Sequence, residues 1–231
     1  MPGLLGPRDP AQPLLTLLVG PARVELSGGT TANWLAKTAN LLVDGYGAPG
    51  RVGLLLPLHW QPVCLLLGAA ATGATVVLVS EPALLAGCAV AFTTAQAAPA
   101  ALAAGVDDVL VVSGHPMGAP VESVPPGAVD AALEIPAYGD RFAGPEVPDP
   151  EIEVDGRGLG TVPDLGLTGT DRLLTCLPLV GGLGVLLAAL GAGASLVLVP
   201  STADVDVVRA GRAERITATA GLDLPGVRRV G

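Results

Sequence analysis

A strand–helix–strand unit occurs twice in this chain, and the repeat constrains the fold more than any other feature. Residues 52–79 read VGLLLPLHWQPVCLLLGAAATGATVVLV, and residues 173–199 read LLTCLPLVGGLGVLLAALGAGASLVLV. Each copy runs from an apolar strand through Leu-Pro-Leu and a long apolar helix to Gly-Ala and a second apolar strand. Such a repeat predicts a pseudo-symmetric α/β fold, in which helical crossovers link parallel strands.

Composition and charge limit the classes of partner. Hydrophobic residues make up 50% of the chain, more than a disordered protein carries. Twelve Lys and Arg residues stand against 21 Asp and Glu, so the formal net charge is −9. Nucleic acids and anionic membranes bind basic surfaces. We therefore expect no nucleic-acid partner, and expect a protein partner or a homo-oligomer instead.

Two uncharged stretches, residues 52–80 and 173–203, are long enough to cross a bilayer, which takes about 20 residues. Prolines and glycines interrupt both stretches, and both contain valine-rich runs that are typical of buried parallel strands. The N-terminus has no basic segment ahead of its apolar residues, so a signal peptide is not expected. These features disfavour a membrane protein and predict a cytoplasmic one.

The cysteines and histidines are few and scattered. Cys64, Cys88 and Cys176 lie far apart in apolar runs, without a Cys-x-x-Cys pair. Their odd number and spacing predict three reduced thiols in the core. Only His59 and His115 could add imidazole ligands, so no metal site is expected.

Hydrophobic periodicity predicts elements on either side of an irregular segment. Strands are expected at residues 23–26, 88–93, 108–113 and 215–219, and helices at residues 14–19, 31–44, 95–104 and 204–212. Thr30 or Thr31 would cap the second of these helices and Gly45 would end it. The chain then divides into a first βα half (1–113), a Pro/Gly-rich irregular connection (114–170) and a second βα half (171–231). We expect the three segments to form one compact unit.

Several motifs recur in an order that is known from one enzyme superfamily. They are Val24-Glu25-Leu26, Asn33-Trp34-Leu35-Ala36, Pro49-Gly50-Arg51-Val52, Leu56-Pro57 and Gly73-Ala74, followed by Asp171-Arg172, Leu177-Pro178-Leu179 and Gly193-Ala194. In this order they resemble the N-terminal region of acyl-CoA synthetases, which are adenylate-forming, AMP-binding enzymes. The stretches 33–40, 56–60, 138–142 and 214–218 are more similar still to an uncharacterised actinobacterial family that is distantly related to these enzymes.

Departures from the superfamily decide the functional interpretation. The resemblance implies a phosphate loop between the two copies, rich in Ser, Thr and Gly and ending in Lys. Thr168-Gly169-Thr170 is the nearest match in residues 114–170, and it lacks the lysine. Residues 27–31 have the composition of such a loop but precede the first long helix. The family's ribose-binding Asp, later Arg and C-terminal lysine domain would lie beyond residue 231, as in a truncated relative.

Two further candidates come from the ends of predicted strands. Gly182-Leu183-Gly184 follows a strand and suggests a dinucleotide loop, but no acidic residue follows the next strand, and a tight turn explains the glycines better. His59 and Trp60 begin a helix at the carboxyl end of a strand, where α/β sheets place ligands. Alternatively, His59 caps that helix and Trp60 fills the core. The candidate ligand-binding residues are Pro57, His59, Trp60, Gly181 and Gly182.

Taken together, these features predict a pseudoenzyme. No catalytic residue and no metal ligand is assigned, and ATP activation of a carboxylate is not expected, since the groups that stabilise the transferring phosphorus are missing. The leading hypothesis is a non-catalytic relative of AMP-dependent synthetases that acts as a binding or interaction module. The alternative is a residual site for an acyl group or an adenine nucleotide (ATP or AMP), active only with a partner.

Overall fold

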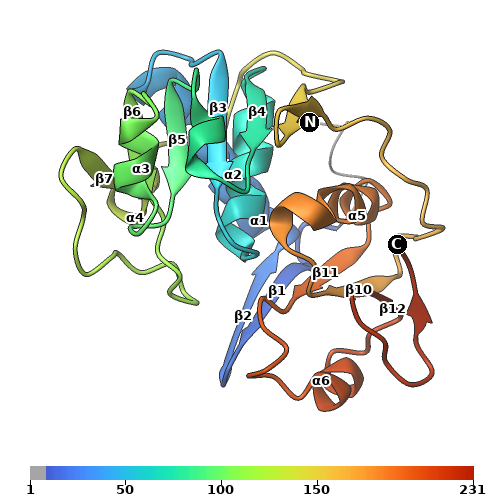
Figure 1. The fold of residues 1–231 in the computed structure, drawn as a ribbon. Coiled ribbons are helices and arrows are strands. Elements are labelled where there is room, and N and C mark those ends of the chain that lie inside the picture. The colour runs from blue at the N-terminus through green and yellow to red at the C-terminus, as the bar shows by residue number, and fades with distance from the viewer. Residues whose placement is uncertain (1–8) are drawn as a thin grey trace. The chain divides into compact units, whose positions relative to one another are not determined.

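The computed structural model describes residues 9–231, and its strands form two sheets (Figure 1). The chain divides into two compact units, which are residues 9–31, 57–60 and 160–231 (unit 1) and residues 32–56 and 61–159 (unit 2). The predicted α/β class with parallel strands is confirmed. The first eight residues of the predicted N-terminal half lie outside the described residues.

Unit 1 holds a six-stranded sheet in which only β1 and β2 are antiparallel. In spatial order the strands are β13 (Arg228–Arg229), β12 (Ala218–Ala220), β10 (Arg172–Thr175), β11 (Ser195–Leu198), β1 (Pro13–Val19) and β2 (Ala22–Ser27). Helices α5 (Leu179–Gly191) and α6 (Val207–Ala213) lie on opposite sides of this sheet (Figure 1). On the α6 side, Leu18, Leu174 and Val197 form an apolar core with Val207 and Ala210 of the helix segment.

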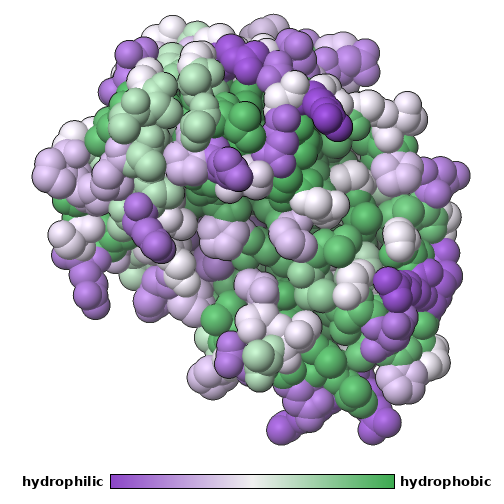
Figure 2. Space-filling view, in the orientation of Figure 1, coloured by the Kyte–Doolittle hydropathy of each residue, from purple (hydrophilic) through white to green (hydrophobic). Residues whose placement is uncertain are grey.

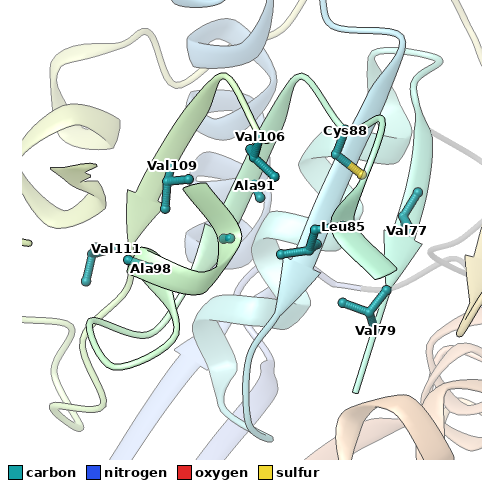
Figure 3. Close-up of a cluster of buried hydrophobic side chains, with 10 residues drawn as sticks. Val77, Val79, Leu85, Cys88, Ala91, Ala98, Val106, Val109 and Val111 are labelled. Atoms are coloured by element: carbon teal, nitrogen blue, oxygen red, sulfur yellow. The ribbon is translucent and has the colours of Figure 1, made fainter. Parts of the chain in front are cut away.

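Unit 2 holds a seven-stranded sheet in which only β8 and β9 are antiparallel. Its spatial order is β7 (Ala128–Asp130), β6 (Asp108–Val111), β5 (Val90–Thr93), β3 (Arg51–Leu55), β4 (Thr75–Leu78), β8 (Ile152–Val154) and β9 (Arg157–Gly158). The short helix α3 (Ala98–Ala103) covers one face of this sheet (Figure 3). The cluster beneath it is built from Val, Ala, Leu and Cys side chains without an aromatic ring.

The remaining helices belong wholly or partly to unit 2. They are α1 (Gly28–Asn40) with the π-helical turn Leu41–Gly45, α2 (Trp60–Ala71), α4 (Ala131–Glu134) and the 3-10 turns Pro82–Leu85 and Ile135–Ala137. The outward residues of α3 are Pro99, Ala100 and Ala103, and Figure 2 shows the pale green of alanine over this helix. No helix within residues 9–231 is long and apolar enough to cross a membrane.

The repeat that the sequence predicts is present in both units. β3, α2 and β4 form the first copy, and β10, α5 and β11 form the second, each with its two strands parallel. Gly73 and Gly193 end the two helices with φ angles of 85° and 80°, a conformation that side chains resist. The flanking strands correspond as well, since β8 lies beside β4 as β1 lies beside β11, and β5 lies beside β3 as β12 lies beside β10.

The structure corrects two local predictions near the N-terminus. Residues 14–19 were expected as a helix, yet they lie in strand β1, which pairs with β11 on one side and β2 on the other. A short apolar run is compatible with a buried helix and with a strand that pairs on both sides. Here the pairing with two neighbouring strands makes it a strand. The cap of α1 is Ser27, whose hydroxyl accepts from the Thr30 N–H at 3.1 Å, rather than Thr30 or Thr31.

Residues 114–170 contain more structure than their composition suggests. The short strands β7 and β8 extend the unit 2 sheet at both ends, and the Asp130 side chain accepts from the Ala132 N–H at the start of α4. The sheets also cross the expected segment boundaries at residues 113 and 171, because β1 pairs with β11 of the C-terminal segment and β2 pairs with β1. Strands of two or three residues leave too short a pattern to be predicted from periodicity.

Charge is divided unequally between the units. Unit 2 contains thirteen acidic and four basic side chains, so its formal charge of −9 equals that of the whole chain. All three thiols are free, and Cys64 and Cys88 are buried as predicted, whereas Cys176 is partly exposed. Burial raises the pKa of the Cys64 thiol above its ordinary value. The net negative charge of the chain is therefore carried by unit 2.

The contact between α1 and α2 gives a test of the packing in unit 2. A Cβ atom at Gly68 would lie 2.5 Å from the Thr38 Cβ and 2.9 Å from the Leu35 carbonyl oxygen. Gly68→Ala should therefore lower the free energy of unfolding by about 1 to 3 kcal/mol, as measured by urea denaturation. Gly50→Ala is the matched control, because no atom lies within 4 Å of its added Cβ. Equal stabilities of the two variants would contradict the close helix contact.

Candidate functional site

The five predicted ligand-binding residues lie around the starts of two helices in unit 1. Pro57 is exposed, whereas His59 and Trp60 are 5% and 2% exposed, with Trp60 as the first residue of α2. Their ring centroids are 5.6 Å apart with a tilt of 34°. The Trp60 burial agrees with the alternative that this ring fills the core. Whether these residues bind a ligand stays a prediction.

The two glycines of that set lie in the first turn of α5, which begins at Leu179 directly after Pro178. Gly182-Leu183-Gly184 was expected as a strand-to-helix turn, but the structure places it inside the helix. A Cβ at Gly182 would lie 2.7 Å from the Leu177 Cβ, so packing requires a glycine there. Gly181 has no neighbour within 4 Å of such an atom. A loop that could hold a pyrophosphate is therefore not formed at these glycines.

The segment nearest in sequence to a phosphate loop is closed by a carboxylate of the chain itself. Asp171 Oδ2 accepts from the Thr168 N–H at 2.8 Å and from the Thr168 hydroxyl at 3.0 Å. Asp171 Oδ1 accepts from the Thr217 hydroxyl at 2.7 Å. Burial alone would raise the pKa of Asp171, but these hydrogen bonds outweigh it and hold the pKa below its usual value. At neutral pH the donors of this turn thus face a fixed negative charge.

The chain contains a single lysine, Lys37 on α1. Its ammonium group donates to the carbonyl oxygens of Pro136, at 3.2 Å, and Tyr138. One turn further along α1, the Asn40 side chain donates to the carbonyls of Gly139 and Arg141. Lys37 therefore attaches the 136–141 segment to α1 within unit 2. The two carbonyl oxygens bind the Lys37 ammonium group, so its position is explained without a bound ligand.

An ion network centred on the buried Glu214 joins residues of β1, β2, β10 and β11 in unit 1. Glu214, 8% exposed at its side chain, accepts from Arg23 Nε at 2.6 Å and from Arg172 Nη2 at 2.6 Å. Arg172 also donates to the hydroxyls of Thr16 and Ser195. The hydrogen bond from Arg23 holds the pKa of Glu214 below its usual value against the effect of burial, with Arg172 adding to it. The sequence gives no local signal for this network beyond the resemblance noted at residues 214–218.

The two copies of the repeat differ in the side chains that lie beside the amino ends of their strands. Arg51 begins β3 and Arg172 begins β10, and each pairs in register with a hydroxyl residue, Thr75 or Ser195. In the first copy, strand β8 supplies carboxylates, because Arg51 makes a two-point contact with Glu153 and Thr75 donates to Glu151. By register, the matching residues of β1 are Thr16 and Leu14, which carry no charge.

An open cleft of about 570 Å³ lies at the amino ends of β1, β10 and β11 in unit 1. Its polar lining consists of Asp9, Gln12, Thr170, Asp171, Arg172, Ser195 and Arg215. Ligand sites in parallel sheets usually lie at the carboxyl ends of strands. The cleft is at the opposite end of β10 from Gly181 and Gly182, and none of the five predicted ligand-binding residues lines it.

The ion network gives a test with a defined pH dependence. Glu214→Gln should lower the free energy of unfolding by about 2 to 3 kcal/mol at pH 7, because it leaves two arginines without their carboxylate. The pKa of Glu214 in the folded protein is below the ordinary 4.5. The stabilisation is thus complete above that value and is lost as the pH falls through the folded pKa. Urea unfolding of both proteins should show the difference shrinking below pH 4.5.

Asp223→Asn is the matched control for this experiment. The Asp223 carboxylate also contacts an arginine, Arg229 at 3.1 Å, but it is 77% exposed. Its loss should change the free energy of unfolding by less than about 0.5 kcal/mol. A Glu214→Gln effect as small as that of the control, or one that persists undiminished at about pH 3, would contradict the role given to the network.

Several solved structures share the fold of this chain. An acyl-CoA synthetase from Brucella canis matches with a TM-score of 0.71 and 17% identity, over 92% of this chain and 45% of that one. The N-terminal domain of FACL13 from Mycobacterium tuberculosis matches with a TM-score of 0.65 and 18% identity, over 92% of this chain and 59% of that one. The chain thus has the fold of the N-terminal region of adenylate-forming enzymes, as predicted, and spans about half the length of these structures.

A curated relative then gives the particular family. A protein of Mycobacterium tuberculosis described as "TIGR03089 family protein" is 34% identical over 224 residues, which cover 90% of this chain and 91% of the relative. No protein-family model matches the chain. On the strength of the relative, the chain belongs to the TIGR03089 family. The predicted resemblance to a family distantly similar to AMP-binding enzymes is confirmed.

Proposed function

We propose that this protein is a non-catalytic relative of AMP-dependent synthetases that acts as a binding or interaction module. One observation carries the proposal: the Asp171 carboxylate accepts from both the N–H and the hydroxyl of Thr168, at the start of the Thr168–Thr170 turn. An ionised carboxylate in this position repels the negative oxygens of a triphosphate, whereas phosphate loops offer free N–H and hydroxyl donors. The engagement of Lys37 with two carbonyl oxygens supports the same conclusion.

The module would act in the cytoplasm on a protein partner or on a second copy of the chain. The free thiols of Cys64 and Cys88 support a reducing compartment. The formal charge of −9 on unit 2 opposes binding to nucleic acid.

A second candidate function is a residual site for an acyl group or an adenine nucleotide. It is favoured by the placement of Pro57, His59, Trp60, Gly181 and Gly182 in the same unit, each near the start of a helix that follows a strand. His59 would donate to or accept from the ligand, and the exposed Gly181 would leave room for it. Such a site would hold ATP or AMP without turning it over, or would turn it over only with a partner.

Calorimetric titration with Mg-ATP, AMP and a non-hydrolysable acyl-adenylate separates these candidates. The module predicts no heat of binding that depends on His59, and no release of pyrophosphate from ATP with a panel of carboxylic acids and CoA. The residual site predicts saturable binding of one of the three, weakened at least about tenfold in His59→Ala.

The matched control is His115→Ala, because His115 lies in a loop of unit 2 and is not one of the predicted residues. Equal weakening by both substitutions would remove the residual-site candidate. Release of pyrophosphate that depends on an added carboxylic acid would show a catalytic protein and end the proposal.

A further inference from the structure

Strand β2 forms one edge of the unit 1 sheet, and no strand within residues 9–231 pairs with its outer side (Figure 1). It has six residues, whereas the other edge strands that the structure describes, β7, β9 and β13, have two or three. Proteins usually protect a sheet edge with a short strand, a bulge, a proline or charge. β2 contains no proline, and the irregularity in its pairing with β1 lies at Pro13–Leu15 of β1. Its remaining protection is the charge of Arg23 and Glu25.

The main-chain hydrogen bonds of β2 alternate in direction. A two-residue turn, Gly20-Pro21, joins β1 to β2, and the Gly20 φ of +52° fits the type II′ turn of such hairpins. The pair of residues that flanks a two-residue turn exchanges hydrogen bonds, and so does every second pair after it. Val24 therefore directs its N–H and C=O groups toward β1. Arg23 and Glu25 direct theirs away from β1, toward the open edge.

The sequence Arg23-Val24-Glu25 is complementary in charge to itself when it is read in the opposite direction. If the β2 of a second copy adds antiparallel to this edge, with Val24 on the two-fold axis, Arg23 of each copy lies opposite Glu25 of the other. The outward N–H and C=O groups of these two residues meet in the same register. An axis through Arg23 or through Glu25 would instead place like charges opposite each other, which destabilises a strand pair.

The two charged side chains keep atoms for this contact. Arg23 donates from Nε to Glu214 and from Nη2 to Glu25 and Glu214, and Glu25 accepts at Oε2. Arg23 Nη1 and Glu25 Oε1 make no hydrogen bond to any residue in 9–231, and the two side chains are 47% and 32% exposed. A pair between the copies would thus extend the ion network around Glu214 without breaking it.

The distribution of charge favours a second copy at this edge. Unit 2 carries the whole formal charge of −9, so unit 1 is formally neutral. Contact between two copies of unit 2 would join surfaces of the same sign, whereas contact through unit 1 does not.

We propose that β2 is the surface at which two copies of this protein pair, as antiparallel strands related by a two-fold axis through Val24. The inference rests on the proposed function, an interaction module, and names its partner and its contact surface. One face of the joined strands would carry the alternating charges of Arg23 and Glu25. The other would bring the two Val24 side chains together, next to Leu17, which is in register with Val24.

Sedimentation equilibrium of the full chain should show a monomer–dimer equilibrium. Glu25→Arg places an arginine opposite Arg23 of the second copy, so the dissociation constant of the dimer should rise at least about tenfold. Arg23→Glu should have a similar effect, and an equimolar mixture of the two variants should restore association, because every arginine again faces a glutamate. The matched control Glu122→Arg makes the same charge change at an exposed residue of unit 2 and should leave the constant unchanged.

A disulfide tests the register without a change in the ion network. Two Val24 residues on the axis form a pair that exchanges no hydrogen bonds, with Cα atoms about 4.5 Å apart, which a disulfide can span. In a Cys176→Ser background, which removes the partly exposed native thiol, Val24→Cys should give covalent dimers under mild oxidation. The matched control Ala22→Cys lies on the same face of β2 but opposite Leu26 of the second copy, and should stay monomeric on a non-reducing gel.

A parent chain that remains monomeric at every concentration, or equal cross-linking of Val24→Cys and Ala22→Cys, would overturn the proposal. A dimer whose dissociation constant is unchanged by Glu25→Arg would overturn it too, because that dimer would be built on another surface. The pyrophosphate assay decides the proposed function separately. A catalytic protein could still pair through β2, and a monomer could still be a non-catalytic module for another protein.

Discussion

Parallel pairing of strands that are buried on both faces is the constraint on which the rest of this structure depends. In β3 and β4, and again in β10 and β11, side chains on either face of the sheet contact other protein atoms, so the strand interiors accept few polar groups. In these four strands charged residues are therefore confined to the ends. Arg51 and Arg172 occupy the first residue of their strands, and the ion pairs, the closed turn at Asp171 and the open cleft all lie within a few residues of these ends.

The same constraint explains how much of the fold can be predicted from the sequence. Continuous apolar runs bounded by Leu-Pro-Leu and Gly-Ala predict both copies of the repeat, because strand and helix lengths fit between fixed breaks. The run at residues 14–19 has no such breaks, and its identity as β1 depends on pairing with β11, almost 180 residues away in the chain. β7 and β8 are too short to leave a periodic pattern. The local sequence pattern thus identifies long elements with clear boundaries. It misses short strands that form only because they pair with neighbouring strands.

The site is predictable from the sequence mainly where the residues depart from an expected motif. The lack of a lysine after Thr168-Gly169-Thr170 is visible in the sequence, but the closure of that turn by Asp171 is a matter of three-dimensional geometry. Arg23 and Glu214 are 191 residues apart, so their contact leaves no spacing to detect. The left-handed backbone conformation of Arg215 cannot be predicted from the sequence either, because arginine rarely adopts a positive φ.

The attachment of Lys37 has a consequence for covalent modification of the protein. Acetylation, ubiquitin-type conjugation and other amine chemistry that targets lysine side chains find a single acceptor in this chain. That amine is partly exposed and donates to the carbonyls of Pro136 and Tyr138, so modification of the amine competes with these two hydrogen bonds. Lysine modification would then weaken the attachment of the 136–141 segment to α1 and leave the Asn40 side chain to hold it.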